Sequence, residues 1–580
     1  MKRKLLSFLL VSIVASFAFL HILTSVNAAT QWTFDEQTGT LTFTGQGKIE
    51  ANGIPAWYDY YKKATSLVIE EGITAIGKGA FSGFKNLTSV SIPSTLQEIG
   101  SDAFHHCSSL VTFPFHDNIT SIGDTAFSGC SKLKEVVVPS KVTVIKSGVF
   151  QGCTALEKVV LHSKVTKIEQ SAFMACAKLK EIVIPDSVTE IELGAFSDCT
   201  ALERVVIGKG IRKIEKQTFS GCSGLKEITV PDGVTTISET AFSRCKNLEK
   251  VTIGTGISEY TPIAFDSCPN LKEFVVSKDN AAFCSVEGVI YSKDKTKLVD
   301  IPEGYAGIYA VIPGTNTIEK FAGTKCEKLI GIIIPGSVSE ISEEAFSECT
   351  SLQYVYLEKG VTYIRQKAFR NCKALSQMTF PNTISVIEED AFGQCESLSD
   401  IAFLGILPNI KAVEAYYSDA GTFRGVTAKV RIPAEGSSWD NRKNYGGNLT
   451  WVKVSCSEHS MEAWTVLTQA TETGIGMEKR HCTICGLAEV KEIAKLPPTT
   501  PTQPTTPTQP ATQPNEEQTV TTVPTEVQKP AATDPAPTQP TENTGSEEAP
   551  ATFLWIAVGI GAAVLIAAGV VALIRVRKKH

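Results

Sequence analysis

The sequence predicts a mainly β repeat solenoid, and two regularities indicate it. Phenylalanine recurs every 23 residues, nine times without a slip, and from the second occurrence onward a cysteine follows three positions later. The nine residues are Phe81, Phe104, Phe127, Phe150, Phe173, Phe196, Phe219, Phe242 and Phe265. A fixed period of this length is typical of proteins whose units stack and contact only their neighbours.

One unit cannot fold alone. The unit at residues 172–194 contains six regularly placed apolar residues, namely Phe173, Leu179, Ile182, Ile184, Val188 and Ile191. Burying them yields roughly 10 to 20 kcal/mol, whereas ordering the unit costs roughly 35 kcal/mol. Stacking is therefore required for stability.

Each unit is expected to contribute one short strand. Strand alternation points Ile182 and Ile184 inward and Val183 outward. Successive strands then form a parallel sheet on one face, and we expect the coil to be right-handed. The Ala-Phe-x-x-Cys segment is long enough for only a turn or two of helix, so short helical turns are expected on the opposite face.

The two ends of the chain indicate export and anchoring. Residues 1–28 have a basic start, an apolar stretch and a small-x-small cleavage pattern, which predicts a secretory signal peptide; an uncleaved N-terminal anchor is the alternative. Residues 552–574 carry no charge and precede the basic tail 575–580, which predicts one transmembrane helix with a cytoplasmic C-terminus. A cell-wall sorting signal is the alternative, although no Leu-Pro-x-Thr-Gly motif is present. The ectodomain would lie outside the cell.

The remaining boundaries follow from pattern and composition. Residues 29–63 contain alternating segments around Thr38-Gly39 and predict a β-hairpin cap, and residues 281–302 predict an inserted hairpin around Lys293–Lys295. The repeats are expected at residues 64–280 and 303–412. They are followed by a C-terminal cap at 413–454, a Cys/His module at 455–493 and a Pro/Thr-rich disordered stalk at 494–551. After the insert we expect ring positions at Phe321, Phe346, Phe369 and Phe392.

The unit carries an Ile, an Ala-Phe pair, a Cys, a Leu and an Ile-Pro at fixed spacings from Gln31 to Val454. In this it resembles the BspA-like leucine-rich repeat surface proteins. The resemblance implies a leucine-rich repeat coil in a secreted or surface-bound bacterial adhesion protein. It implies no particular ligand.

The repeat cysteines occupy the same place in successive units. They are Cys107, Cys130, Cys153, Cys176, Cys199, Cys222, Cys245, Cys268, Cys326, Cys349, Cys372 and Cys395. Disulfides are one interpretation for an exported protein, and stacked neighbours lie within disulfide reach. The equal spacing favours a buried ladder of free thiols instead.

Charge also follows the repeat. The position after the repeat leucine alternates in sign from Lys134 to Lys272, and the next position alternates in the opposite sense from Glu135 to Glu273. Units stacked in register would pair these charges, so we expect a solvated, self-neutralised surface there. After the insert, the outward positions become Ile333, Tyr354 and Tyr356. Exposed aromatic residues with little charge are typical of interface centres, which makes these three the candidate partner-binding residues.

A second candidate site lies beyond the repeats. Cys456, His459, Cys482 and Cys485 form two pairs with two-residue spacing, which suits one tetrahedral Zn²⁺ in a zinc-ribbon-like module. Four protein ligands leave no open position, so the zinc would be structural. Disulfide pairing is the alternative, and His481 is an alternative ligand.

The sequence therefore predicts a cell-surface binding protein. Its partner would be an extracellular protein or glycan on a host or neighbouring cell. A structural or envelope-organising protein without a host ligand is the alternative. No catalytic constellation is visible, so an enzyme, with a site in residues 281–302, is least expected. The net charge of −6 and the lack of an internal basic block argue against nucleic acid. The oligomeric state is not indicated.

Overall fold

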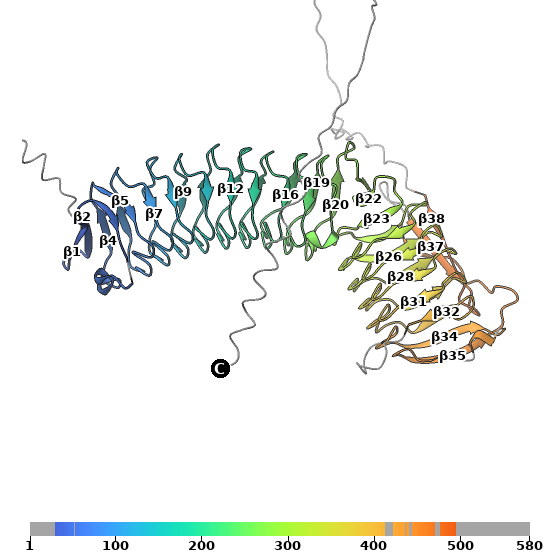
Figure 1. Cartoon of the computed structure of the whole chain (residues 1–580). Helices are drawn as coiled ribbons and strands as arrows, with labels where there is room; N and C mark the ends of the chain where they lie inside the picture. The colour runs from blue at the N-terminus through green and yellow to red at the C-terminus, as the bar shows by residue number, and fades with distance from the viewer. Residues whose placement is uncertain are drawn as a thin grey trace, which may run out of the picture. The chain divides into compact units, whose positions relative to one another are not determined.

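The computed structural model describes residues 29–51, 53–411, 421–435, 437–439, 443–469 and 476–494. These residues form a mainly β solenoid in which strands of successive turns lie side by side (Figure 1). They belong to one compact unit, Met1–Thr500. The predicted repeat solenoid is confirmed.

The stack begins with an antiparallel pair that has its turn at Thr38-Gly39, and then becomes parallel. The first elements are β1 (Gln31–Asp35), β2 (Thr40–Thr44), β3 (Gly47–Ile49), the 3₁₀ helix η1 (Ala56–Tyr60), β4 (Ser66–Ile69) and β5 (Ile73–Ile76). Trp57 of η1 packs edge-on against Phe43 of β2, with 5.0 Å between ring centroids. An aromatic cluster thus covers this end of the core.

Most of the following turns contribute two short parallel strands rather than one. The longer strands are β6 (Ser89–Ser91), β9 (Glu135–Val137), β11 (Lys158–Val160), β13 (Glu181–Val183), β15 (Arg204–Val206), β17 (Glu227–Val230), β19 (Lys250–Ile253) and β20 (Glu273–Val276). The two-residue strands are β7 (Glu98–Ile99), β8 (Ser121–Ile122), β10 (Val144–Ile145), β12 (Lys167–Ile168), β14 (Glu190–Ile191), β16 (Lys213–Ile214) and β18 (Thr236–Ile237). A helix η2 (Pro262–Phe265) follows.

The insert forms an antiparallel meander of three strands, one more than the predicted hairpin. These are β21 (Phe283–Val286), β22 (Val289–Ser292) and β23 (Lys297–Asp300). Ile290 and Val299 face the core of the first set of turns, whereas Val289, Tyr291 and Leu298 face the core of the second. The insert is therefore the wall shared by two hydrophobic cores.

The second set of turns repeats the same plan. Its longer strands are β24 (Gly307–Ala310), β26 (Leu329–Ile334), β28 (Tyr354–Leu357), β30 (Gln377–Phe380), β32 (Asp400–Phe403), β34 (Thr427–Pro433) and β35 (Asn448–Val454). Its short strands are β25 (Thr317–Ile318), β27 (Glu340–Ile341), β29 (Tyr363–Ile364), β31 (Val386–Ile387) and β33 (Asn409–Ile410). Near its end, η3 (Ser437–Trp439) places Trp439 against Phe403 and Trp451. The last elements, β36 (Thr465–Thr468), β37 (Gly476–His481) and β38 (Ala488–Ile493), form a separate antiparallel sheet.

A column of phenylalanine rings runs through the first core. The rings from Phe81 to Phe265 stack on one another with centroids 5.1–5.8 Å apart. The repeat cysteines lie beside the column as free, buried thiols, which confirms the predicted ladder. Each thiol from Cys107 to Cys268 also donates to the carbonyl oxygen of the previous turn's phenylalanine, at 3.2–3.3 Å. The cysteine thus satisfies a buried acceptor that a purely apolar residue would leave unpaired.

Apart from the 3₁₀ helix η2 at Phe265, the described wall that carries the phenylalanines is not helical, so the expectation of short helical turns was wrong for the other turns. In one turn, Ser171 and Ala175 have φ values of 55° and 60°. Such left-handed residues interrupt helical hydrogen bonding. The amide of Ala175 instead donates to the carbonyl of Ser197 in the next turn, at 2.7 Å. Backbone groups of this wall therefore bind neighbouring turns, as in a sheet.

The expected ring position at Phe321 was also wrong. Counting 23 residues back from Phe346 gives Gly323, and a Cβ at Gly323 would lie 2.9 Å from the Phe346 ring. Phe321 has a φ of 64° and lies partly exposed, with the Lys320 ammonium 4.7 Å from its ring centroid. The ring column is thus interrupted in the turn after the insert.

The predicted pairing of charges between neighbouring turns is found in part: among the described residues, the second column forms three ion pairs and the first column forms one. Lys158 lies opposite Glu135, with 2.5 Å between Nζ and Oε1, and Lys272 Nζ lies 2.7 Å from Glu249 Oε2. Arg204 pairs with Glu181 in the same way. These side chains are largely exposed, so each pair stabilises the fold by about 1 kcal/mol or less.

Buried acidic groups join the two cores at the insert. Tyr260 donates to the carboxylate of Asp300, and burial raises the pKa of Asp300 well above its usual value. Burial also raises the pKa of Glu303 to about 7, although the Ser267 amide donates to this carboxylate at 2.7 Å.

The terminal predictions fall outside the described residues. These are the signal peptide 1–28, nearly all of the stalk 494–551, the transmembrane helix 552–574 and the tail 575–580. Within the described part of the chain, no helix is long and apolar enough to span a bilayer.

Removing one ring from the column should be costly. Phe196 is fully buried between two stacked rings, so we expect Phe196→Ala to lower the free energy of unfolding by about 3–5 kcal/mol. Val183, which is 49% exposed, provides the control, because Val183→Ala should change stability by less than about 0.5 kcal/mol. Urea unfolding followed by circular dichroism measures both. Equal effects would show that the column does not dominate stability.

The buried thiols should make stability fall at alkaline pH. Burial raises the pKa of Cys199 to about 12, above the value of about 8.5 in an unfolded chain. The neutral thiol therefore favours folding fully below about pH 8.5, and this contribution is lost as the pH rises toward the folded pKa. We expect the urea concentration at the unfolding midpoint to decrease as the pH rises above about 8.5. The decrease should be smaller in Cys199→Ala.

The same burial should block alkylation at neutral pH. Iodoacetamide is expected to label Cys199 and Cys222 only after unfolding, because both are fully buried. Rapid labelling of the native protein, or disulfide-linked peptides found by mass spectrometry, would contradict the thiol ladder.

Candidate functional site

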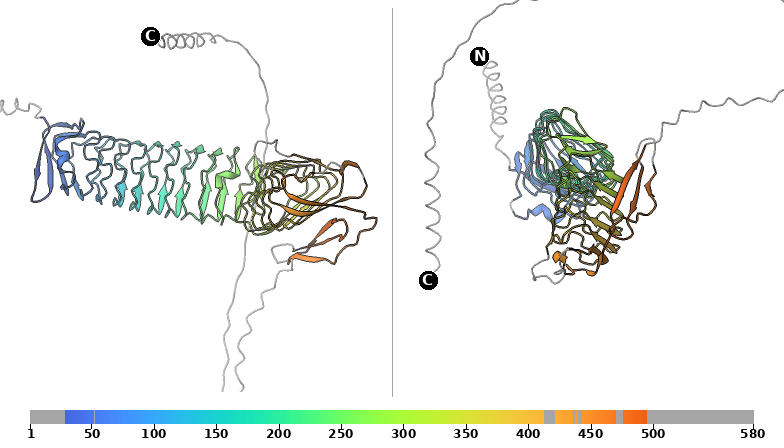
Figure 2. Two further views of the ribbon diagram at one scale, coloured as in Figure 1. Left: turned by 90° about the horizontal axis from the view of Figure 1, so that it is seen from below. Right: turned by 90° about the vertical axis from the view of Figure 1, so that its right-hand side faces the viewer.

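The Cys/His module lies against the outer face of the second set of turns (Figures 1 and 2). The Thr379 hydroxyl of β30 donates to the carbonyl of Gly486 at 2.8 Å. Arg431 of β34, held by an ion pair with Asp400, donates to the carbonyl of Thr483 at 3.3 Å. These contacts join residues that are distant in sequence, and they fix the turn before β38 on the solenoid.

Gly486 allows this close approach. Its φ is +81°, and a Cβ at this position would lie 2.7 Å from the Cβ of Ala402 on β32. Both the backbone conformation and the available space therefore require glycine.

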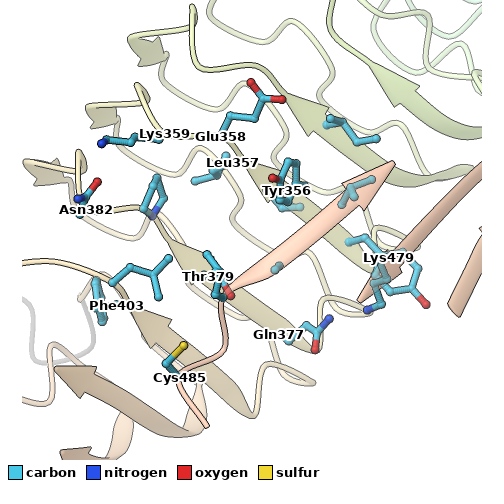
Figure 3. A pocket seen from close by; sticks show the side chains of 18 of the residues that line it. Tyr356, Leu357, Glu358, Lys359, Gln377, Thr379, Asn382, Phe403, Lys479 and Cys485 are labelled. Atoms are coloured by element: carbon cyan, nitrogen blue, oxygen red, sulfur yellow. The ribbon is translucent and has the colours of Figure 1, made fainter. Parts of the chain in front are cut away.

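The module does not fill the space over the sheet, and a cavity of about 740 Å³ remains between them (Figure 3). Ile333, Tyr354 and Tyr356 contribute to its floor. Leu467, Leu487 and Val490 of the module contribute to its opposite wall. Polar groups of Gln377, Thr379 and Asn382 also line it. A cavity of this size, with mostly apolar walls and a few polar groups, is typical of ligand sites.

All three predicted partner-binding residues thus lie together at this cavity. Each is half-buried, because the module covers the face that the sequence left open. Burial raises the pKa of the Tyr356 hydroxyl, with further contributions from Glu358 and Glu489. The expected exposed patch is therefore the floor of a covered site.

Lys479 of β37 brings a positive charge to the cavity. Its ammonium lies 4.2 Å from the centroid of the Tyr354 ring, and burial lowers its pKa. Among the described residues, no carboxylate lies within 4 Å of this ammonium. The charge of Glu462 tends to raise the pKa of Lys479, but the Glu462 carboxylate contacts His481 instead, with 2.9 Å between Oε2 and Nδ1.

The four predicted metal ligands converge beside the cavity. Cys456 and His459 follow β35, and Cys482 and Cys485 lie in the turn between β37 and β38. Their ligand atoms all lie within 4.8 Å of one another. Cys456 Sγ is 3.7 Å from Cys482 Sγ and 3.4 Å from His459 Nδ1, and Cys485 Sγ is also 3.4 Å from His459 Nδ1.

These separations match the edges of a metal tetrahedron. Zn–S bonds of about 2.3 Å and Zn–N bonds of about 2.0–2.1 Å place two sulfurs about 3.8 Å apart and a sulfur and nitrogen about 3.6 Å apart. A disulfide needs sulfurs at about 2.05 Å. The residues therefore fit one metal ion.

The thiols of this cluster also affect each other's ionisation. Partial desolvation and the neighbouring thiols of Cys485 and Cys482 raise the pKa of Cys456 to about 12. Burial of Cys482 tends to raise the pKa of its thiol. Hydrogen bonds from the backbone amides of Cys485 and Ile484 and from His459 outweigh this effect and lower the pKa to about 6. A bound cation would relieve this crowding of thiolates. His481 is not part of the cluster, because it faces Glu462.

The repeats match the model of the BspA type leucine rich repeat region over residues 54–180, 166–286 and 310–418. The chain belongs to this family. Nothing among the curated proteins matches it.

Solved structures with similar chains include three bacterial proteins. A leucine-rich repeat protein from Bacteroides ovatus is 20% identical, with 73% of this BspA-type chain and 98% of that chain covered and a TM-score of 0.42. A leucine rich cell surface protein from Faecalibacterium prausnitzii is 23% identical, with coverage of 73% and 97% and a TM-score of 0.29. The pneumococcal vaccine antigen PcpA is 16% identical, with coverage of 73% and 97% and a TM-score of 0.35.

The sequence did not identify the module's contribution to the cavity. Lys479, Leu487 and Val490 were not candidate residues, although they approach Tyr354 and Tyr356. The alternation Met477, Lys479 on β37 was the only available signal, since it places Lys479 on the same face as the buried Met477.

Proposed function

We propose that this BspA-type protein is a bacterial cell-surface adhesion protein that recognises an extracellular protein or glycan. The observation that carries the proposal is the cavity of about 740 Å³ that gathers Ile333, Tyr354 and Tyr356 beneath the module. Aromatic anchors in desolvated pockets supply much of the binding energy at interfaces. The family and the predicted signal peptide and anchor support an extracellular position.

The first set of turns supports binding less well. A hollow of about 920 Å³ lies over its charge columns, but Glu203, Lys226 and Glu249 are among the residues that line it. Solvated charges of this kind contribute little to affinity. A structural or envelope-organising role without a host ligand remains the alternative. The described residues contain no recognised catalytic constellation, which favours a binding protein over an enzyme.

We further propose that Cys456, His459, Cys482 and Cys485 hold one structural Zn²⁺. The atom separations and the donor set of three thiolates and one imidazole support zinc. With four protein ligands, the ion would stabilise the module and would take no part in a reaction.

Metal analysis tests the zinc proposal. Residues 29–494 contain both cores, so the ectodomain is a suitable protein for this measurement. We expect about one zinc per chain, and clearly less than one in Cys485→Ser, because a ligand is lost. Cys284→Ser, which changes a cysteine of the insert, is the matched control and should keep the zinc. Absent zinc together with a Cys482–Cys485 disulfide would contradict the proposal.

Partner binding tests the adhesion proposal. Binding of the ectodomain to immobilised host matrix proteins and to a glycan array would identify a partner. Tyr354→Ala combined with Tyr356→Ala should weaken that binding by at least about 1 kcal/mol, whereas Lys180→Ala combined with Lys226→Ala should change it little. Both variants must first show unchanged unfolding curves. Loss of binding in the lysine variant alone would place recognition on the charge columns instead.

A further inference from the structure

The cavity beneath the module has a chemical character beyond a general recognition surface. Its floor and opposite wall are apolar, from Ile333, Tyr354 and Tyr356 on one side to Leu467 and Val490 on the other. A ligand must therefore bring an apolar body to displace water from these walls.

Two lysines line the cavity, and neither forms an ion pair with a carboxylate of the described residues. Lys359 is exposed, whereas Lys479 is half-buried. Lys479 contacts the face of Tyr354, and within the described ranges its ammonium has no carboxylate at ion-pair distance. The neighbouring lysine on the paired strand differs, because Lys491 Nζ lies 2.8 Å from Glu478 Oε1 on the outer face of the module. Only the inward-facing lysine thus lacks an anionic partner in this pair. A half-buried cation is costly unless an anion compensates it.

Among the described residues, Glu358 is the one carboxylate that lines the cavity, and it is already engaged. Glu358 lies in the loop after β28. Its carboxylate accepts a hydrogen bond from the backbone amide of Gly336 at 2.9 Å. Figure 3 shows Glu358 and Lys479 on different elements around Tyr356. Gln377 and Thr379 supply neutral polar groups on the β30 side of the cavity. The polar groups of the cavity therefore leave room for one anionic group beside Lys479.

We propose that this cavity binds a small amphiphilic organic acid, with its aromatic or aliphatic body between the tyrosines and the module and its anionic group beside Lys479. The proposal uses the same cavity as the adhesion proposal, but its test needs no macromolecular partner. The module makes the site, because the solenoid alone provides only the floor.

Two matched fluorescent probes test the proposal. Anilinonaphthalene sulfonate and N-phenylnaphthylamine share the same aromatic body, and only the first carries an anionic group. Both become fluorescent in apolar surroundings. We expect the ectodomain, residues 29–494, to bind the sulfonate more tightly than the neutral probe. Lys479→Met should weaken binding of the sulfonate by roughly tenfold, and should leave the affinity for the neutral probe unchanged or higher.

Control variants make the outcome specific. Lys491→Met removes a lysine from the outer face of the same sheet and should change neither probe, and Lys479→Arg should retain the preference for the sulfonate. Tyr354→Ala combined with Tyr356→Ala should weaken both probes, since it removes apolar walls.

Three results would overturn the proposal. Unchanged sulfonate binding in Lys479→Met would show that the lysine does not meet the anion. An equal loss of both probes in that variant would show that the mutation disturbs the cavity rather than a charge contact. Unchanged binding of both probes in the tyrosine variant would place the probes elsewhere. None of these results bears on binding of a macromolecular partner, which is measured separately.

Discussion

The phenylalanine column sets the register of the solenoid. In the regular turns, each ring stacks on the ring 23 residues earlier, and the thiol beside it donates to the carbonyl of that earlier phenylalanine. The strands, the charge columns and the left-handed residues recur with the same 23-residue spacing. A slip of one residue would unstack the rings, leave a buried carbonyl unpaired and turn apolar side chains outward. The register is therefore fixed by packing and by hydrogen bonding together.

Regular stacking also limits what the surface can do. In the first set of turns, several of the outward charges pair with their neighbours along the stack, as Lys158 does with Glu135. These pairs favour the correct register, but a partner would have to displace them to bind. The second set of turns has Ile333, Tyr354 and Tyr356 in place of these charges. The module covers the face of the sheet that carries these three residues. The surface with the least self-neutralised charge is thus the one that the chain itself uses.

The sequence predicted the features that repeat and missed those that do not. The 23-residue spacing predicted the stack, the thiol ladder and the charge pairs, because each depends only on equivalent positions in adjacent turns. It misplaced Phe321, because the insert breaks the count and Gly323 occupies the ring position. It also predicted helical turns, since a short Ala-Phe segment does not reveal that Ser171 and Ala175 adopt positive φ. The four candidate cysteine and histidine ligands could be listed from their spacing, but their placement beside the cavity could not.

The position of the module depends on contacts that no local pattern encodes. Thr379 binds Gly486, and Arg431 binds Thr483, across long stretches of sequence. The described part of the module has three strands and few buried apolar residues, so it needs further stabilisation. A metal ion at Cys456, His459, Cys482 and Cys485 would hold its turn, and the solenoid supplies the surface against which its inner face packs. Because sheets pack about 10 Å apart, side chains as different as Lys479 and Ala488 cannot fill the gap evenly. The cavity is the space that this packing leaves, so the same contacts that anchor the module also shape the candidate site.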